Sequence, residues 1–171
     1  SITGWMNNPD ILFDEKILQK GAKIVKDVNK QVAEIIGINS AARTTCVKPS
    51  GNASVLLQTA SGIHAEHSNM YIRNVQMNKE SEITQAIMKT NPYMVEDSVW
   101  SAGGTDVVVS FPILPKKGSM YKDDLLGVKH LELVKKAQKH WVEAGTNEDL
   151  CADKGVRHNV SNTIIVDDWD Q

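Results

Sequence analysis

The sequence has little cysteine, little net charge and no long apolar run, and each shortage excludes a class of protein. Its 171 residues include 2 cysteines, Cys46 and Cys151, which lie far apart and suggest neither a disulfide framework nor a cysteine-based metal site. A formal net charge of −2 gives no basic field for nucleic acid or anionic membrane. No apolar run approaches the roughly 20 residues that cross a bilayer. We therefore expect a cytoplasmic protein that binds neither nucleic acid nor membrane.

The length and composition are typical of one globular domain. Apolar residues make up 41% of the chain and charged residues 23%, which is enough to form a core and too balanced for disorder. We therefore expect residues 1–171 to form a single domain. The chain opens with SITGWMNNPD and closes with IIVDDWDQ, without a starting methionine or a polar tail. We expect it to be a portion of a longer protein.

Hydrophobic periodicity predicts helices that alternate with strands. Long amphipathic helices are expected over residues 14–37, between an Asp14 cap and a Gly37 stop, and over about 123–144. Shorter helices are expected after residue 54 and from Ser81 onward. β-branched or alternating runs predict strands over residues 42–47, 69–77, 106–113 and 160–166. The alternation predicts an α/β fold with mostly parallel strands.

The stretch KPSGNAS, residues 48–54, predicts a tight bend with free backbone amides. Pro49 fixes φ and has no N–H, and Gly51 permits backbone angles that other residues avoid. If the bend opens a helix, several N–H groups point at one spot that favours an anion. The spacing alone favours an ordinary capped turn over a phosphate site, because no Gly-Lys-Ser/Thr follows as in a P-loop.

The other reactive side chains favour structural roles. Cys46 lies in a β-branched run and is expected to be a small buried hydrophobe, although a thiol enzyme that uses an exposed Cys46 stays an alternative. His64 and His67 are close enough to share a metal, but no third ligand has a matching spacing. From the residues alone we assign no catalytic group and no metal ligand.

A resemblance to a known family begins at residue 42. Residues 42–76 read ARTTCVKPSGNASVLLQTASGIHAEHSNMYIRNVQ. This stretch resembles the segment of the adenosylcobalamin-dependent (class II) ribonucleotide reductases that reads approximately TTxKPSGTxSLLxGxxxGIHPxxxxYYIRRV. The likeness continues, in the same order, through NPYMVEDSVW, DVVVSFPI, QKHWVEAGT and HNVSNTIIV.

The resemblance implies a fold, a reaction and a site. It implies a portion of a ten-stranded α/β barrel, with mostly parallel strands and two long helices, from the C-terminal part of a monomeric ribonucleoside-triphosphate reductase. Such an enzyme converts ribonucleoside triphosphates to deoxyribonucleotides, for DNA replication, by radical chemistry that needs adenosylcobalamin. Matched position by position, the resemblance assigns contact with the substrate phosphates to Ser50, Gly51, Asn52, Ala53 and Ser54.

The chain also departs from the family pattern. Asn52 stands where the phosphate loop usually has threonine, and Asn74 replaces the second arginine of Ile-Arg-Arg. The Asn-Pro-Cys-x-Glu loop that carries the radical cysteine is missing, and Cys46 and Cys151 match neither of the two cysteines that supply electrons. The chain is therefore expected to be inactive alone.

The expected partners are a ribonucleotide substrate and the remaining part of the reductase chain. A parallel sheet cut from a barrel has unpaired strand edges, so self-association through those edges is also expected. The alternative function is a stand-alone, non-catalytic module that binds phosphate or serves a structural role. An Asn-Pro-Cys-x-Glu segment in a companion chain would decide between the two.

Overall fold

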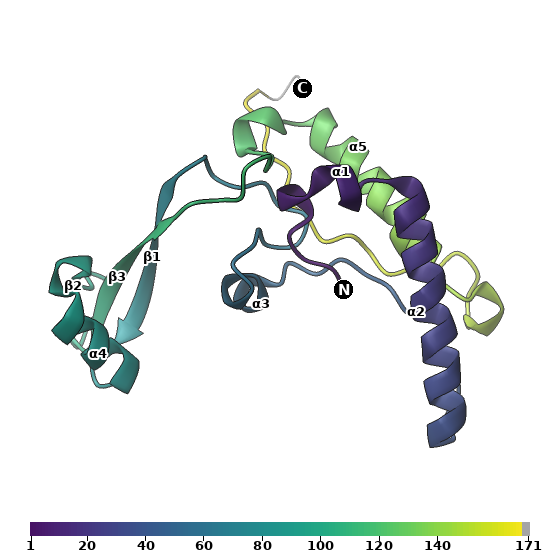
Figure 1. Ribbon diagram of the computed structural model, residues 1–171, viewed down its shortest axis with the longest axis horizontal. Coiled ribbons are helices and arrows are strands. Elements are labelled where there is room, and N and C mark those ends of the chain that lie inside the picture. The colour runs from purple at the N-terminus through teal and green to yellow at the C-terminus, as the bar shows by residue number, and fades with distance from the viewer. Residues whose placement is uncertain (169–171) are drawn as a thin grey trace. The chain divides into compact units, whose positions relative to one another are not determined.

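The computed structural model describes residues 1–168, which fall into two compact units (Figure 1). One unit contains Ser1–His67 and the chain from Pro115 onward, and the other is Ser68–Leu114. The single domain expected from the length stays a prediction. None of the helices within residues 1–168 is both long enough and apolar enough to cross a membrane.

The longest helix of the first unit, α2 (Glu15–Ile36), confirms the prediction for residues 14–37. The Asp14 carboxylate accepts a hydrogen bond from the Ile17 N–H at 2.8 Å, which satisfies one of the free donors of the first turn. Gly37 ends the helix in the left-handed conformation, with φ of 72°. These local signals fix both ends of α2.

The other helices of this unit are shorter. They are α1 (Pro9–Leu12), α3 (Gly51–Leu56) and α5 (Val128–Ala137), and a π-helical segment, Gln138–Glu143, continues α5. The predicted helix over about 123–144 is wrong at its start. Lys122–Asp124 forms a separate 3-10 turn, and Gly127 then adopts φ 50° and ψ −118°, a conformation that only glycine adopts readily. Further 3-10 turns lie at Trp5–Asn7 and Glu148–Leu150.

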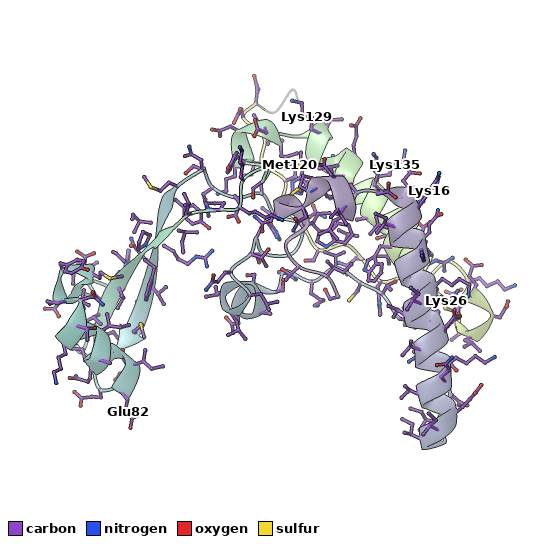
Figure 2. All side chains as sticks on the ribbon, in the orientation of Figure 1. Lys16, Lys26, Glu82, Met120, Lys129 and Lys135 are labelled. Atoms are coloured by element: carbon purple, nitrogen blue, oxygen red, sulfur yellow. The ribbon has the colours of Figure 1, made fainter. Side chains whose placement is uncertain are left out.

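A core of buried apolar side chains joins these helices to the intervening loops. Segments far apart in sequence meet at Met120, labelled in Figure 2, because its N–H donates to the Met6 carbonyl at 2.8 Å and its carbonyl accepts from the Glu66 N–H at 3.1 Å. The Trp5 and Phe13 rings pack with centroids 5.4 Å apart. The core consists of Trp5, Met6, Phe13, Leu18, Ala22, Val47, Ala60, Ile63, Leu125, Ala137, Trp141, Val142 and Val160.

The second unit is a three-stranded antiparallel sheet with one helix. The strands are β1 (Tyr71–Asn78), β2 (Val95–Asp97) and β3 (Asp106–Ile113), in the order β1-β3-β2. β1 pairs with β3 over the full length of both strands. Helix α4 (Glu82–Thr90) connects β1 to the 3-10 turn Pro92–Met94, and Ser81 caps its start as predicted. The predictions of strands over 69–77 and 106–113 are confirmed.

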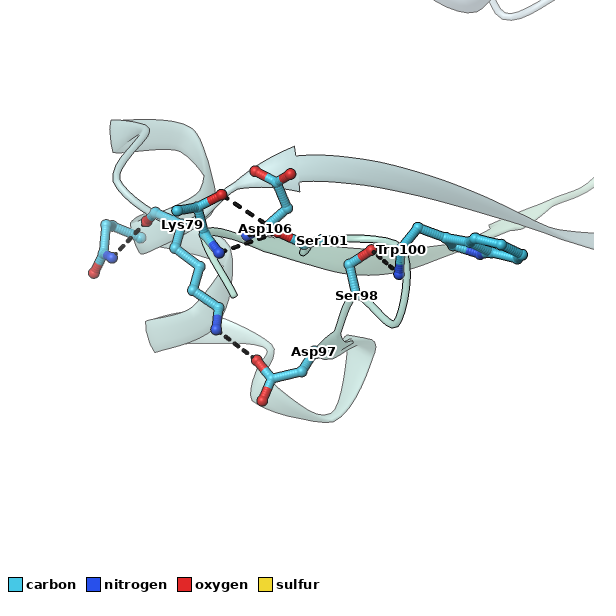
Figure 3. A network of polar contacts seen from close by, with 8 residues as sticks. Lys79, Asp97, Ser98, Trp100, Ser101 and Asp106 are labelled. Atoms are coloured by element: carbon cyan, nitrogen blue, oxygen red, sulfur yellow. Dashed lines mark hydrogen bonds and ion pairs between the residues drawn. The ribbon is translucent and has the colours of Figure 1, made fainter. Parts of the chain in front are cut away.

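Polar contacts close the end of this sheet (Figure 3). Lys79 Nζ pairs with Asp97 Oδ1 at 2.7 Å, which ties the end of β1 to β2. Ser101 Oγ accepts from the Asp106 N–H at 3.2 Å, and Ser98 Oγ accepts from the Trp100 N–H at 3.3 Å. The turn between β2 and β3 is therefore held by serine hydroxyls.

The predicted strands over 42–47 and 160–166 do not form ladders in the described chain. Val47 and Val160 form one parallel bridge, and Arg43 forms one antiparallel bridge with Thr146. The chain is α/β, and the sheet that forms within the described residues is antiparallel, so the expected mostly parallel barrel strands stay a prediction. A ladder requires a neighbouring strand along the whole segment, and the described residues provide two isolated bridges to residues 42–47 and one to residues 160–166.

Candidate functional site

The bend predicted at residues 48–54 is confined to residues 48–50, because α3 begins at Gly51 and not after residue 54 as expected. Ser50 precedes the helix in the left-handed conformation, with φ 49° and ψ 42°, which is unusual for a residue other than glycine. The first intrahelical bond runs from the Ser54 N–H to the Ser50 carbonyl at 2.9 Å. Among the described residues, the N–H groups of Gly51, Asn52 and Ala53 have no hydrogen-bond acceptor. All three residues are exposed, so their amides are accessible to an anion.

The two serine hydroxyls of the bend are used within the chain. Ser50 Oγ donates to Thr3 Oγ1 at 2.7 Å and accepts from the Gly62 N–H at 3.1 Å. Ser54 is 2% exposed, and its Oγ donates to the Gly51 carbonyl at 2.9 Å. The hydroxyls therefore hold the backbone of the bend in place, and the amides are the groups that face outward.

A second loop, at residues 59–62, packs against the backbone of the bend. A Cβ on Gly62 would lie 2.5 Å from the Lys48 carbonyl oxygen, and Gly62 has φ of +54°, so only glycine fits. The Gly62 N–H also donates to Thr3 Oγ1 at 2.9 Å, and the Ser61 hydroxyl donates to the Pro49 carbonyl. The position of the bend thus depends on close backbone approach at Gly62.

Asn7 anchors this second loop to the rest of the unit. It is buried, and its Oδ1 accepts from the Thr59 hydroxyl at 2.5 Å and from the Ala60 N–H. Its Nδ2 donates to Glu66 Oε1 at 2.8 Å and to Ser119 Oγ at 2.9 Å. One amide side chain therefore uses both of its donors and both acceptor sites to connect three segments.

Thr3, Asn7 and Gly62 position the bend, although sequence reasoning had assigned them no role. Thr3 and Asn7 lie in the N-terminal segment, far from the bend in sequence, and no spacing rule connects them to it. Gly62 lies in the loop that follows α3, next to Ser61. An isolated glycine beside a loop was the one signal that could have indicated a close backbone approach.

The cysteines and histidines have structural surroundings. Cys46 is half-buried and its carbonyl accepts from Trp141 Nε1 at 3.1 Å, while Cys151 Sγ lies 3.5 Å from the Asn147 carbonyl. His64 Nδ1 lies 2.8 Å from the Ser61 carbonyl oxygen. Within residues 1–168, no group of three His, Cys, Asp or Glu side chains is placed to hold a metal ion.

His130 is a buried histidine beside the loop that supports the bend. Burial lowers the pKa of His130 below 6.5, a nearby His64 lowers it further, and a hydrogen bond with the Ile63 carbonyl opposes the change. Its Nε2 lies 3.0 Å from that carbonyl oxygen. Because Ile63 follows Gly62, His130 fixes the loop that supports the bend.

Comparison with known proteins shows similarity to one group of enzymes. No family model matches the chain. It is 29% identical over 123 residues to a probable adenosylcobalamin-dependent ribonucleoside-triphosphate reductase of Dictyostelium discoideum, covering 72% of this chain and 16% of that protein. It is 26% identical over 126 residues to the adenosylcobalamin-dependent ribonucleoside-triphosphate reductase of Euglena gracilis, covering 74% and 17%.

A solved structure shows the same relationship in fold. The crystal structure of a B12-dependent (class II) ribonucleotide reductase superposes with a TM-score of 0.64 at 18% identity, covering 74% of this chain and 18% of that one. The chain thus spans less than a fifth of the length of each protein that it matches. This chain is similar in sequence to one segment of the adenosylcobalamin-dependent ribonucleoside-triphosphate reductases and in fold to one segment of a class II ribonucleotide reductase.

Proposed function

We propose that this chain is the part of an adenosylcobalamin-dependent ribonucleoside-triphosphate reductase that binds the phosphates of the substrate. The complete enzyme would convert ribonucleoside triphosphates to deoxyribonucleotides. The residues in contact with phosphate would be those of the bend and the first turn of α3: Ser50, Gly51, Asn52, Ala53 and Ser54.

One observation carries this proposal: three consecutive N–H groups at the start of α3 are exposed and have no acceptor among the described residues. Backbone amides at a helix start favour an anion because each donor carries a partial positive charge that points outward. A phosphate group can accept from several such donors at once. The similarity to ribonucleoside-triphosphate reductases supports the proposal that this anion is the phosphates of a nucleotide.

The five residues would have two different roles, contact with phosphate and stabilisation of the bend. Gly51, Asn52 and Ala53 would donate their N–H groups to phosphate oxygens. Ser50 and Ser54 would act mainly through the hydrogen bonds that keep the bend in shape, since their hydroxyls already donate within the chain. The exposed Asn52 side chain could add an amide donor where the family usually has a threonine hydroxyl.

The groups that perform the radical chemistry would come from the rest of the enzyme. Neither Cys46 nor Cys151 lies in an Asn-Pro-Cys-x-Glu sequence. Adenosylcobalamin supplies the radical in the complete reductase, but the residues present do not fit it. Two pockets of the second unit measure about 360 and 230 Å³, near the lower limit of roughly 300 Å³ for a drug-sized ligand, and adenosylcobalamin is much larger than such a ligand. The partner of this chain would therefore be the remaining part of the reductase, which would hold the cofactor.

The barrel expected from the resemblance also belongs to this proposal. Val47 and Val160 form a parallel bridge, and the Ser161 N–H donates to the Val47 carbonyl at 3.1 Å. This contact supports a parallel pairing of the segments at residues 42–47 and 160–166. The proposed barrel would continue each segment with neighbours from the rest of the reductase.

A charge placed at the helix start tests the site. Asn52→Asp keeps the size of the side chain and adds an acid to the first turn of α3, where it favours the helix. Near a bound phosphate the same charge costs about 1 kcal/mol in water and more at a partly buried surface, so affinity should fall at least about fivefold. Gln58→Glu is the matched control. It lies two residues beyond Leu56, past the far end of α3 and on the order of 9 Å from Asn52, where salt screens the charge.

The measurement is a titration of the chain with a ribonucleoside triphosphate and with inorganic triphosphate, followed by NMR of labelled amides. We expect the Gly51, Asn52 and Ala53 signals to shift in the unchanged chain and in Gln58→Glu, and to shift much less in Asn52→Asp. Absence of these shifts in the unchanged chain, or equal affinity in the two variants, would contradict a phosphate site here. Shifts with both ligands at equal affinity would favour a simple phosphate-binding module over a nucleotide site.

A further inference from the structure

Helix α5 continues beyond Ala137 as the π-helical segment Gln138–Glu143, an uncommon geometry that is often found at functional sites. Its last turn contains the carbonyls of Trp141 and Val142. The carbonyls of a last turn depend on hydrogen-bond donors from beyond the helix. Here both accept from a residue of the segment at residues 42–47, which leads directly into the bend.

The donor to both carbonyls is the hydroxyl of Thr45. Its Oγ1 lies 2.7 Å from the Trp141 carbonyl oxygen and 3.3 Å from that of Val142. Thr45 is 1% exposed, so water cannot take the place of these partners. In the opposite direction, the Trp141 Nε1–H donates to the carbonyl of Cys46 at 3.1 Å. We call these hydrogen bonds, from the Thr45 hydroxyl and from Trp141 Nε1, the Thr45–Trp141 contact.

The backbone of Thr45 is also held, by the C-terminal part of the first unit. His158 Nδ1 lies 3.0 Å from the Thr45 carbonyl oxygen, and the His158 carbonyl accepts from Gln138 Nε2 at 3.1 Å. The Ser161 N–H donates to the Val47 carbonyl at 3.1 Å. Thr45 is therefore fixed at two points, through its hydroxyl and through its carbonyl.

The position of Thr45 is passed to the bend through four residues, Cys46–Pro49, which include no glycine. The carbonyls of Cys46 and Val47 accept the hydrogen bonds described above. The Lys48 N–H donates to Ser1 Oγ at 3.1 Å, and the Pro49 carbonyl accepts from the Ser61 hydroxyl. Because each of the four residues is held and Pro49 also has a fixed φ, a displacement at Thr45 would reach the bend.

We propose that Thr45 is a positioning residue of the phosphate site, which it serves by fixing the bend through the Thr45–Trp141 contact. The inference rests on the proposed function, because it concerns the amides of Gly51, Asn52 and Ala53 as phosphate donors. Thr45 would not touch the phosphate, since its hydroxyl is buried and already donates to Trp141. Loss of the hydroxyl should weaken phosphate binding by changing the placement of the donors, and not by removing one.

Substitutions at two neighbouring threonines test this role. Thr45→Val removes the hydroxyl and keeps the branched shape, and the affinity for inorganic triphosphate should fall about fivefold, the equivalent of the roughly 1 kcal/mol of one hydrogen bond. Thr45→Ser keeps the hydroxyl and should restore most of the affinity. Thr44→Val is the matched control, because the Thr44 hydroxyl and N–H both donate to the Gly145 carbonyl, at 2.8 and 3.0 Å, and one bond remains.

Two measurements separate positioning from stability. NMR of labelled amides gives the affinity for triphosphate, and amide hydrogen exchange reports on the bend without a ligand. The Ser54 N–H, which donates to the Ser50 carbonyl at 2.9 Å, should exchange faster in Thr45→Val and not in Thr44→Val. If Thr45 served stability alone, Thr45→Val would unfold at lower urea while its triphosphate affinity stayed unchanged. That result, or a Thr45→Ser variant that restores no affinity, would overturn the inference.

A second variant keeps the test decisive if Thr45→Val does not fold. Trp141→Phe removes the N–H that donates to the Cys46 carbonyl, and it should also weaken triphosphate binding. Unchanged affinity in a folded Trp141→Phe would overturn the positioning role and leave the phosphate site standing. Absence of binding by the unchanged chain would overturn the phosphate site itself, and this inference with it.

Discussion

Replacing Asn7 by aspartate changes one group of a buried side chain and removes both of its hydrogen-bond donors. In the present structure those donors serve Glu66 Oε1 at 2.8 Å and Ser119 Oγ at 2.9 Å. A protonated carboxyl group would keep one donor, so it could still bond to Glu66 but not also to Ser119. The lost hydrogen bond would cost about 1 kcal/mol.

At neutral pH the new carboxyl group is unfavourable both when it is ionised and when it is protonated. If it ionises, it faces the Glu66 carboxylate, and two charges about 4 Å apart repel by about 4 kcal/mol at an effective dielectric constant of 20. If it stays protonated, it takes up a proton about three pH units above the ordinary aspartate pKa of about 3.9, which also costs about 4 kcal/mol. With the lost hydrogen bond, Asn7→Asp should therefore lower the free energy of unfolding by about 5 kcal/mol at pH 7.

The pH dependence separates this reasoning from a simple packing defect. The folded variant holds a proton that its unfolded chain releases above about pH 4, so its stability falls as the pH rises. The loss relative to the unchanged chain should shrink to about 1 kcal/mol near pH 4. Urea unfolding followed by tryptophan fluorescence, to which the buried Trp5 and Trp141 contribute, measures it, with Asn39→Asp on the exposed surface as control. A loss that is independent of pH would refute the argument.

Three further substitutions test other contacts of the first unit. Gly62→Ala should destabilise the unit by about 2 kcal/mol or more and weaken phosphate binding, because its Cβ would meet the Lys48 carbonyl oxygen at 2.5 Å; calorimetry and ligand titration measure the two effects. Gly145→Ala should cost about 3 kcal/mol in urea unfolding without a direct effect on the phosphate loop, because its Cβ would lie 1.9 Å from the buried Thr45 Oγ1. Burial lowers the pKa of His130, so the unfolded chain takes up its proton first and stability should fall as the pH drops below 6.5; His130→Gln should reduce that slope in a thermal melt.

Helices with their own caps were predictable from the sequence. The ends of α2 follow from Asp14 and Gly37, and the start of α4 follows from Ser81, whose side chain accepts from the Thr84 N–H. Each of these signals acts within four residues of the end that it fixes. The start of α5 was missed because the polar, acidic turn before it resembles a helix start, while Gly127 interrupts the helix with a backbone conformation that composition does not reveal.

The presence of a turn before α3 was predicted from the sequence, but its backbone conformation was not. Pro49 and Gly51 indicated a turn into a helix, which the structure contains. The left-handed Ser50 could not be predicted, because an isolated serine avoids φ of 49°. Its conformation is held by hydrogen bonds to Thr3 and Gly62, residues that come close only in the folded chain. The sequence therefore predicts where the candidate site lies. The geometry of the site depends on tertiary contacts and cannot be predicted from local sequence.

The segments at residues 42–47 and 160–166 have the composition of strands, but their composition does not predict whether a neighbouring strand is present. β-branched residues indicate that a segment suits a pleated, half-buried surface, but a strand exists only when a neighbour supplies hydrogen bonds along its length. Val47 and Val160 are buried and bridge each other, which is the part of the pairing that this chain provides. The neighbours that would complete both segments lie, under the proposed barrel, in the remaining part of the reductase. Under that proposal, strand composition without a ladder is expected of both segments, and pairing with the remaining part of the reductase is the step that would convert them into strands.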